Sequence, residues 1–178
     1  DRDRSRSDHS REMNETWIYH EKQFSLLCGQ HCLNNLLQGP YFDAPGLAQI
    51  GQELDAEERR VMLEAGADTP EALRFLAEDS GNVDETGNFS VQVLNTALEK
   101  SHGLTLLNTG RRELRDSIRD YTKEEGFVCN RSAHWFAIRR IGRYWWNLNS
   151  TLERPEHVGG FHLCAFLDQL RAEGYQVF

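Results

Sequence analysis

A cysteine that could act as a nucleophile lies in the stretch "QFSLLCGQHCLNN", which runs from Gln23 to Asn35. Cys28 and Cys32 are one helical turn apart there, and such thiols can bind a metal, form a disulfide or attack a carbonyl. The thiolate is the attacking form, and the positive end of a helix stabilises it. Cys28 stands at the expected helix start, and Gly29 after it leaves room for a substrate backbone. We therefore interpret Cys28 as the nucleophile and Cys32 as a core residue.

A cysteine nucleophile needs a base, and the stretch "HWFAIRRIGRYWWNLNS" offers one. We expect an antiparallel hairpin here, with strands 134–140 and 143–149 joined by a tight turn at Ile141–Gly142. A symmetric turn of this kind places His134 directly opposite Asn149, with Cβ atoms about 4.5–5.5 Å apart. The asparagine can then accept the Nδ1–H proton of the ring and leave Nε2 free as a base. The register thus predicts a Cys–His–Asn triad.

Other polar residues near Cys28 are weaker candidates for a role as oxyanion donor, base or metal ligand. Gln23 lies five residues before Cys28, and its side-chain amide could donate to an oxyanion beside the Cys28 backbone N–H. His31 lies on the same helix, where it is a poor base for an attack directed outward from the helix end. His20 has no evident orienting partner. A zinc site needs about four converging ligands, and Cys28, His31 and Cys32 supply three with no second cluster.

The elements that must position these residues change character along the chain. Apolar residues at helical spacing predict a helix from Leu27 to Gln38, and further helices begin near Asp43, Thr69 and Ser90. The second half is rich in aromatic and β-branched residues. Besides the hairpin, it predicts strands at 104–107, 127–130 and 175–178 and a closing helix at 161–172. Helices that lead and strands that follow favour an α+β fold over a parallel α/β fold.

Composition limits the possible classes of protein. The 178 residues, 39% apolar and 27% charged, fit one soluble domain, and no apolar run approaches a membrane span. Residues 1–16 lack Leu, Ile and Val and any aromatic side chain, so we expect a disordered tail, or a leader that is not native to the protein, before a domain at 17–178. No signal-peptide pattern stands at the N-terminus, which favours a compartment with reduced thiols. Cys129 and Cys164 are accordingly expected to be buried, unpaired small hydrophobes.

The charge is concentrated in one part of the chain. The net charge is −8, which argues against nucleic acid as the main partner. Residues 53–85 hold 11 acidic and 3 basic side chains, so this window accounts for the whole net charge. A solvated helical face is one interpretation of the window. An arm that attracts a basic partner is the other.

Seven segments, in order and spacing, resemble Josephin domains, most closely those of the ataxin-type deubiquitinases. They read "IYHEKQ", "LCGQHCLNNLLQGPYF", "SGN", "FSVQVL", "CN…HWFAIR", "WWNLNS" and "FLDQLRAEGYQVF". The resemblance covers about residues 18–178 and implies a papain-like cysteine protease fold that hydrolyses ubiquitin conjugates. Matched position by position, it places the nucleophile on Cys28, the general base on His134, the orienting asparagine on Asn149 and the oxyanion glutamine on Gln23.

The same resemblance implies the partners. It makes the helical hairpin, about residues 47–76, an arm that holds and gates ubiquitin. It carries ubiquitin contacts over to Tyr41, Phe42, Val91 and Gln92. Close relatives have a tryptophan before the glycine that ends the next helix, where this chain has His102. This departure weakens any second ubiquitin site built on Tyr41 and Phe42.

The resulting expectation is a monomeric thiol hydrolase that acts on ubiquitin and polyubiquitin chains. It would use no cofactor and no metal, bind neither nucleic acid nor membranes, and act in the cytoplasm and the nucleus. A catalytically weak ubiquitin-binding module is the second interpretation, and the cysteine-rich metal site is the third.

Overall fold

A five-stranded sheet forms the centre of the computed structural model, which describes residues 16–23, 27–66, 68–78, 80–83, 88–117 and 120–178. The strand order is β4-β3-β2-β1-β5, and all neighbours are antiparallel. The strands are β1 (Gly126–Arg131), β2 (His134–Ile141), β3 (Tyr144–Asn147), β4 (Glu156–Val158) and β5 (Gln176–Val177). The expected α+β class is confirmed. The predicted disordered tail, apart from Thr16, lies outside the described residues.

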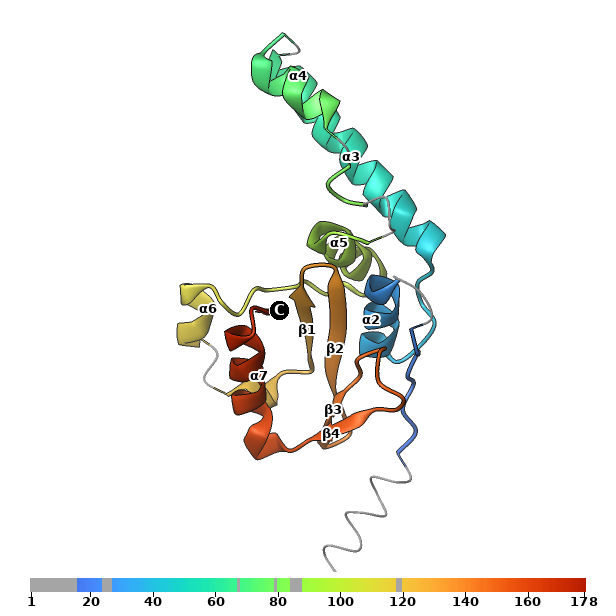
Figure 1. Cartoon of the computed structure of the whole chain (residues 1–178), viewed down its shortest axis with the longest axis vertical. Helices are drawn as coiled ribbons and strands as arrows, with labels where there is room; N and C mark the ends of the chain where they lie inside the picture. The colour runs from blue at the N-terminus through green and yellow to red at the C-terminus, as the bar shows by residue number, and fades with distance from the viewer. Residues whose placement is uncertain (1–15, 24–26, 67, 79, 84–87, 118–119) are drawn as a thin grey trace, which may run out of the picture.

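Helices cover both faces of the sheet, with α2 and α7 on its two sides (Figure 1). The helices are α2 (Cys28–Leu37), α3 (Ala44–Gly66), α4 (Pro70–Ala77), α5 (Val91–His102), α6 (Arg112–Ser117) and α7 (Leu163–Ala172), with 3₁₀ turns η1 (Tyr121–Lys123) and η2 (Gly160–His162). Within the described ranges, no helix is long and apolar enough to span a membrane.

Alternation along the central strands builds two separate cores. Trp135 and Ala137 of β2 face one core with α2 and α5, whereas Phe136 and Ile138 face a second core with α7. Successive side chains of a strand point to opposite faces, so a strand buried on both faces is apolar throughout. This double burial explains why "HWFAI" shows no alternation of apolar and polar residues. It also holds α2 firmly against the face of β2.

Helices α3 and α4 form the predicted hairpin, which projects from the body of the domain (Figure 1). Gly66, with φ of 131°, ends α3, and the Thr69 side chain caps α4 by accepting the Ala72 N–H at 3.2 Å. Leu47 near the base of α3 is fully buried against the first core. Farther along, Val61 and its neighbours are exposed, and the acidic window covers this arm.

The register predicted for the β2–β3 hairpin is wrong by two residues. Ile141 pairs with Tyr144 and Ile138 with Asn147, so the turn is Gly142–Arg143 and not Ile141–Gly142. Gly142 has φ of 61° and takes the first central position of the turn, where type II′ turns place glycine. A shift of two residues preserves the face on which each side chain lies, because the period of a strand is two.

Two other expectations differ from the structure, and two short elements lie outside what the sequence predicts. Residues 104–107 form no strand, and Leu104 and Leu107 remain 46% and 54% exposed. Cys164 is exposed and not buried, because it lies on the outer side of α7, whereas Cys129 is buried as predicted. The short elements β4 and α6 have too few residues to show a period and were not predicted.

Candidate active site

Cys28 is the first residue of α2, and its side chain is 3% exposed. Its Sγ donates a hydrogen bond to the Ala133 carbonyl at 2.9 Å. Burial raises the pKa of the Cys28 thiol, while backbone N–H groups of Trp135, Cys28 and Gly29 oppose this and lower the pKa. These donors include the free N–H groups of the helix start. The helix start thus faces the sulfur as expected, but burial is the larger influence on the unliganded thiol.

His134 is the first residue of β2 and directly follows the Ala133 carbonyl that binds the thiol. The ring is partly buried and stacks on Phe136, with centroids 5.8 Å apart. Burial lowers the pKa of His134, and a side-chain hydrogen bond with Asn149 acts in the opposite direction. An uncharged imidazole at neutral pH is the form that can accept a proton from a thiol.

Asn149 reaches His134 although the two are not directly opposed in the sheet. It lies two residues beyond the end of β3, and the β-pairing continues through the Leu148 N–H, which donates to the Ala137 carbonyl at 2.9 Å. The N–H and hydroxyl of Thr151 both donate to Asn149 Oδ1, at 3.1 and 2.9 Å. The predicted pair thus meets diagonally, since the two-residue register shift kept both side chains on one face.

Gln23 is held next to the segment that carries Asn149. The Gln23 N–H donates to the Ser150 carbonyl at 2.8 Å, and the Ser150 hydroxyl donates to Gln23 Oε1 at 3.0 Å. This arrangement occupies the amide oxygen and leaves Nε2 as the atom that can donate to an oxyanion. Residues 24–26, between Gln23 and the helix, lie outside the described residues.

The two other histidines near the cysteine have structural partners. His31 Nδ1 lies 2.6 Å from Glu21 Oε2, and His20 Nε2 lies 3.0 Å from the Asn149 carbonyl oxygen. The contact between His20 and Asn149 joins residues 129 positions apart, so no local sequence signal could reveal it. Among the described residues, no three His, Cys, Asp or Glu side chains gather as a metal site.

A groove of about 300 Å³ has in its lining Ala133, whose carbonyl accepts from the Cys28 thiol, and none of the four candidate catalytic residues lines it. Phe89, Ser90, Val91 and Trp135 also line this groove. Gly29 does not line this groove. A Cβ there would point at the Phe89 and Leu94 side chains, 3.4 and 3.5 Å away, in ordinary van der Waals contact.

The residues matched to ubiquitin contacts lie in two separate places. Val91, partly buried, and Gln92, exposed, begin α5 beside the groove. Tyr41 is 57% exposed and packs edge-on against His102 at the other end of α5, with ring centroids 4.9 Å apart. Phe42 is partly buried against the first core. The structure therefore places Val91 in the lining of the groove, with Gln92 next to it on α5, and places Tyr41 at the other end of that helix.

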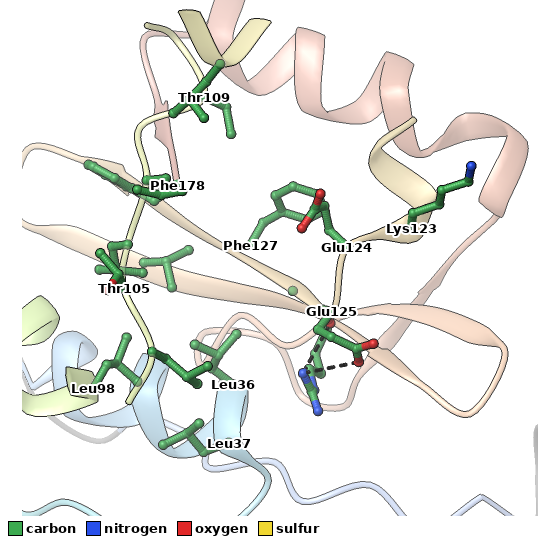
Figure 2. Close-up of a pocket in the computed structure, with 17 residues that line it drawn as sticks. Leu36, Leu37, Leu98, Thr105, Thr109, Lys123, Glu124, Glu125, Phe127 and Phe178 are labelled. Carbon is green, nitrogen blue, oxygen red and sulfur yellow. Dashed lines mark hydrogen bonds and ion pairs between the residues drawn. The ribbon is translucent and has the colours of Figure 1, made fainter. Parts of the chain in front are cut away.

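A cavity of about 420 Å³ lies at a different place on the domain (Figure 2). Leu36 and Leu37 from the end of α2, Leu98 from α5 and Phe127 from β1 contribute to its apolar lining. None of the four candidate catalytic residues lines it. We assign the site by the chemistry of its residues, because apolar volume alone identifies no reaction.

The opposed pKa directions of Cys28 and His134 predict how the free thiol responds to pH. A raised thiol pKa and a lowered imidazole pKa make the neutral pair dominant at pH 7. Alkylation of Cys28 by iodoacetamide should then accelerate about tenfold per unit between roughly pH 7 and pH 9. Peptide mass spectrometry at each pH measures this rate, and exposed Cys164 shows that the reagent is active. A plateau below about pH 7 would instead reveal a thiolate–imidazolium pair.

The fold and the site together define a class. An antiparallel sheet, with a cysteine at the start of a helix packed on its face and a histidine–asparagine pair at the adjoining strand end, is the arrangement of papain-like thiol hydrolases. The Josephin family model matches residues 23–178. The chain belongs to the Josephin family.

Curated relatives agree with this membership. Human ataxin-3 is 46% identical over 161 residues, covering 90% of this chain and 44% of its own length. The human ataxin-3-like protein is 46% identical over 91% of this chain and 45% of its own, and an Arabidopsis thaliana ataxin-3 homologue is 41% identical over 94% and 60%. The chain thus spans less than two thirds of the length of these relatives. Family membership supports a cysteine hydrolase of the deubiquitinating type.

Proposed function

We propose that this chain is a deubiquitinating cysteine protease that hydrolyses isopeptide bonds of ubiquitin conjugates and ubiquitin chains. One observation carries the proposal most directly. The Cys28 thiol donates a hydrogen bond to the Ala133 carbonyl oxygen at 2.9 Å. The next residue, His134, is hydrogen-bonded to the Asn149 side chain. These two contacts, at neighbouring residues near the start of β2, support the assignment of Cys28 as nucleophile, His134 as base and Asn149 as orienter in a chain of the Josephin family.

The proposed reaction follows from these groups. Cys28 transfers its proton to His134, and the sulfur attacks the carbonyl carbon of the C-terminal glycine of ubiquitin. The oxyanion accepts hydrogen bonds from the Cys28 N–H and from Gln23 Nε2. His134 then protonates the leaving lysine amine as the C–N bond breaks, which leaves a thioester. A water that gives its proton to His134 hydrolyses the thioester and restores the thiol.

Substrate binding is assigned to the groove and the arm. The groove beside Val91 can receive the extended C-terminal tail of ubiquitin, which must reach Cys28. The acidic arm faces solvent and suits the basic surface around ubiquitin's apolar patch. We propose ubiquitin and polyubiquitin as the partners of a monomeric enzyme in the cytoplasm and nucleus.

The test of the proposed function is cleavage of a panel of diubiquitins that covers all linkages. We expect at least one linkage to be hydrolysed to monoubiquitin by the native chain. A ubiquitin bearing a C-terminal electrophile should also form a one-to-one adduct, mapped by peptide mass spectrometry to Cys28. Measurable ubiquitin binding without turnover of any linkage would favour a binding module instead.

The charge of the arm should affect binding more than chemistry. Glu58 is a partly exposed side chain of α3 for which no ion pair is found among the described residues, so Glu58→Lys reverses charge without breaking one. We expect a KM for ubiquitin substrates raised about two- to fivefold and kcat nearly unchanged, because rim charges act mainly on association. Added salt should raise KM of the native chain in the same direction. The matched control is Glu156→Lys on the edge strand β4, and an equal effect there would contradict a role for the arm.

A further inference from the structure

Three carboxamide side chains, two of α2 and one of its C-cap residue, form paired hydrogen bonds with backbone groups, as a neighbouring strand would. Each one accepts a backbone N–H through its oxygen and donates to the C=O of that same residue through its nitrogen. Asn34 pairs in this way with Phe42, Asn35 with Glu21, and Gln38 with Tyr19. The distances range from 2.6 Å for Glu21 N to Asn35 Oδ1 up to 3.3 Å for Asn35 Nδ2 to Glu21 O. The side chains thereby satisfy backbone groups of Tyr19, Glu21 and Phe42, which lie outside the strands of the sheet.

Asn35 differs from the other two because it joins two segments. Its side chain is fully buried, and Nδ2 also donates to the Leu148 carbonyl at 2.9 Å. One acceptor and two donors are thus satisfied, which is nearly the full capacity of an amide. Asn35 lies between Glu21 and Leu148 and bridges the two backbones through its side chain.

Two residues further along, the two segments are hydrogen-bonded to each other. Glu21 is followed two residues later by Gln23, and Leu148 is followed two residues later by Ser150. There the segments bond directly, through the Gln23 N–H to the Ser150 carbonyl and the Ser150 hydroxyl to Gln23 Oε1. The Asn35 amide therefore joins the segments at one end, together with the His20 contact to the Asn149 carbonyl, and the Gln23–Ser150 pair joins them at the other.

The Glu21 side chain anchors the same segment to the helix. Its carboxylate accepts from Asn34 Nδ2 at 2.9 Å and from the Tyr19 hydroxyl at 2.5 Å, and it lies 2.6 Å from His31 Nδ1. These bonds hold the Glu21 backbone in place from the opposite direction. A buried polar network with its members satisfied is rigid, because breaking any bond leaves an unpaired group in a low-dielectric interior.

We infer that Asn35 is a positioning residue for catalysis, which acts by holding the Gln23 amide where an oxyanion forms. The inference rests on the proposed function, since it assigns Gln23 the oxyanion role. An oxyanion donor must stand about 2.7–3.1 Å from the developing charge, so a displacement of the segment removes its contribution. Asn35 does not touch the reacting atoms. Its side chain acts through Glu21 and through the Leu148–Ser150 segment.

The test is a double-mutant cycle with a fluorogenic ubiquitin amide as substrate. Asn35→Ala alone should lower kcat about 10²-fold, comparable with loss of one oxyanion donor, and change KM less than about threefold. Gln23→Ala should have a similar effect. Adding Asn35→Ala to Gln23→Ala should cost less than about threefold more, because groups that act as a unit are not additive. If the decrease in kcat of the double variant equals the product of the decreases in the two single variants, the inference is wrong.

Two further variants keep the result interpretable. Leu170→Ala, in the core on the other face of the sheet, provides a destabilised domain with an untouched site and should retain native kcat below its unfolding temperature. If Asn35→Ala does not fold, Asn35→Leu replaces it in the same cycle, because it keeps the side-chain volume without adding a charge and loses both donated bonds. If Gln23→Ala itself leaves kcat unchanged, the oxyanion role in the proposed function is wrong. If Gln23→Ala lowers kcat and the effects multiply, only the role of Asn35 is wrong.

Discussion

Replacement of Cys28 by alanine is expected to abolish hydrolysis of ubiquitin chains, with a loss of at least about 10⁴-fold in kcat. The sulfur is the atom that forms the covalent intermediate, and no neighbouring side chain can take its place. Cys32, one turn deeper, is 1% exposed, and burial raises the pKa of its thiol well above the ordinary value. Cleavage of diubiquitin followed by gel densitometry, and adduct formation with a ubiquitin electrophile, measure the loss.

The matched control for this variant is Cys32→Ala. It removes a sulfur from the same helix and leaves a small cavity, which costs about 1–2 kcal/mol of folding stability. We expect Cys32→Ala to keep adduct formation and turnover and to lower only the unfolding temperature. Cys28→Ala should still bind ubiquitin, because its side chain is buried in the free protein. An adduct that persists in Cys28→Ala would show that another residue is the nucleophile.

Replacement of Asn149 by alanine should lower kcat about 10- to 100-fold and leave the domain folded. The variant removes the hydrogen bond that supports the protonated His134 ring, and with it part of the roughly 10²–10⁴-fold that a positioned base contributes. Without that bond the imidazole pKa falls further, since burial already lowers it. The acid limb of the kcat profile should therefore move to lower pH. Steady-state kinetics across pH, with circular dichroism to verify folding, provides the measurement.

Asn149→Asp is the informative companion variant. A carboxylate keeps the acceptor for the His134 ring and for the two Thr151 donors, so most of the activity should return. Its charge should shift the acid limb to higher pH, because it favours the imidazolium. Equal activity of Asn149→Ala and the native chain would remove the orienting role from Asn149.

Local patterns in the sequence were sufficient to predict most elements that carry the site. The helix start at Cys28, the cap at Thr69 and the glycine ends of α3 and α5 follow from rules that involve only a few neighbouring residues. Predictions of secondary structure were wrong where an apolar pattern was too short to distinguish a strand from an irregular segment. Leucines at 104–107 are as apolar as a strand, but they border a cavity and pair with no strand.

The hairpin shows why a wrong register still led to the right pair. Placing Gly142 second in the turn gave a direct His134–Asn149 opposition, whereas the type II′ position of Gly142 shifts the register by two. Each side chain kept its face because a strand repeats every two residues. A one-residue error would have sent Asn149 to the other face, away from the base.

The sequence by itself determined the types of residues available for chemistry and the helix and strand that bear them, because capping, periodicity and turn preferences are local interactions. Tertiary structure alone decided which distant groups meet. Burial against β2 raises the pKa of the Cys28 thiol. The thiol donates a hydrogen bond to the carbonyl of Ala133, which is over a hundred residues away in sequence. The Asn35 bridge between Glu21 and Leu148 likewise exists only once the two segments lie on α2. Desolvation and long-range hydrogen bonds depend on packing in space, which no short stretch of sequence encodes.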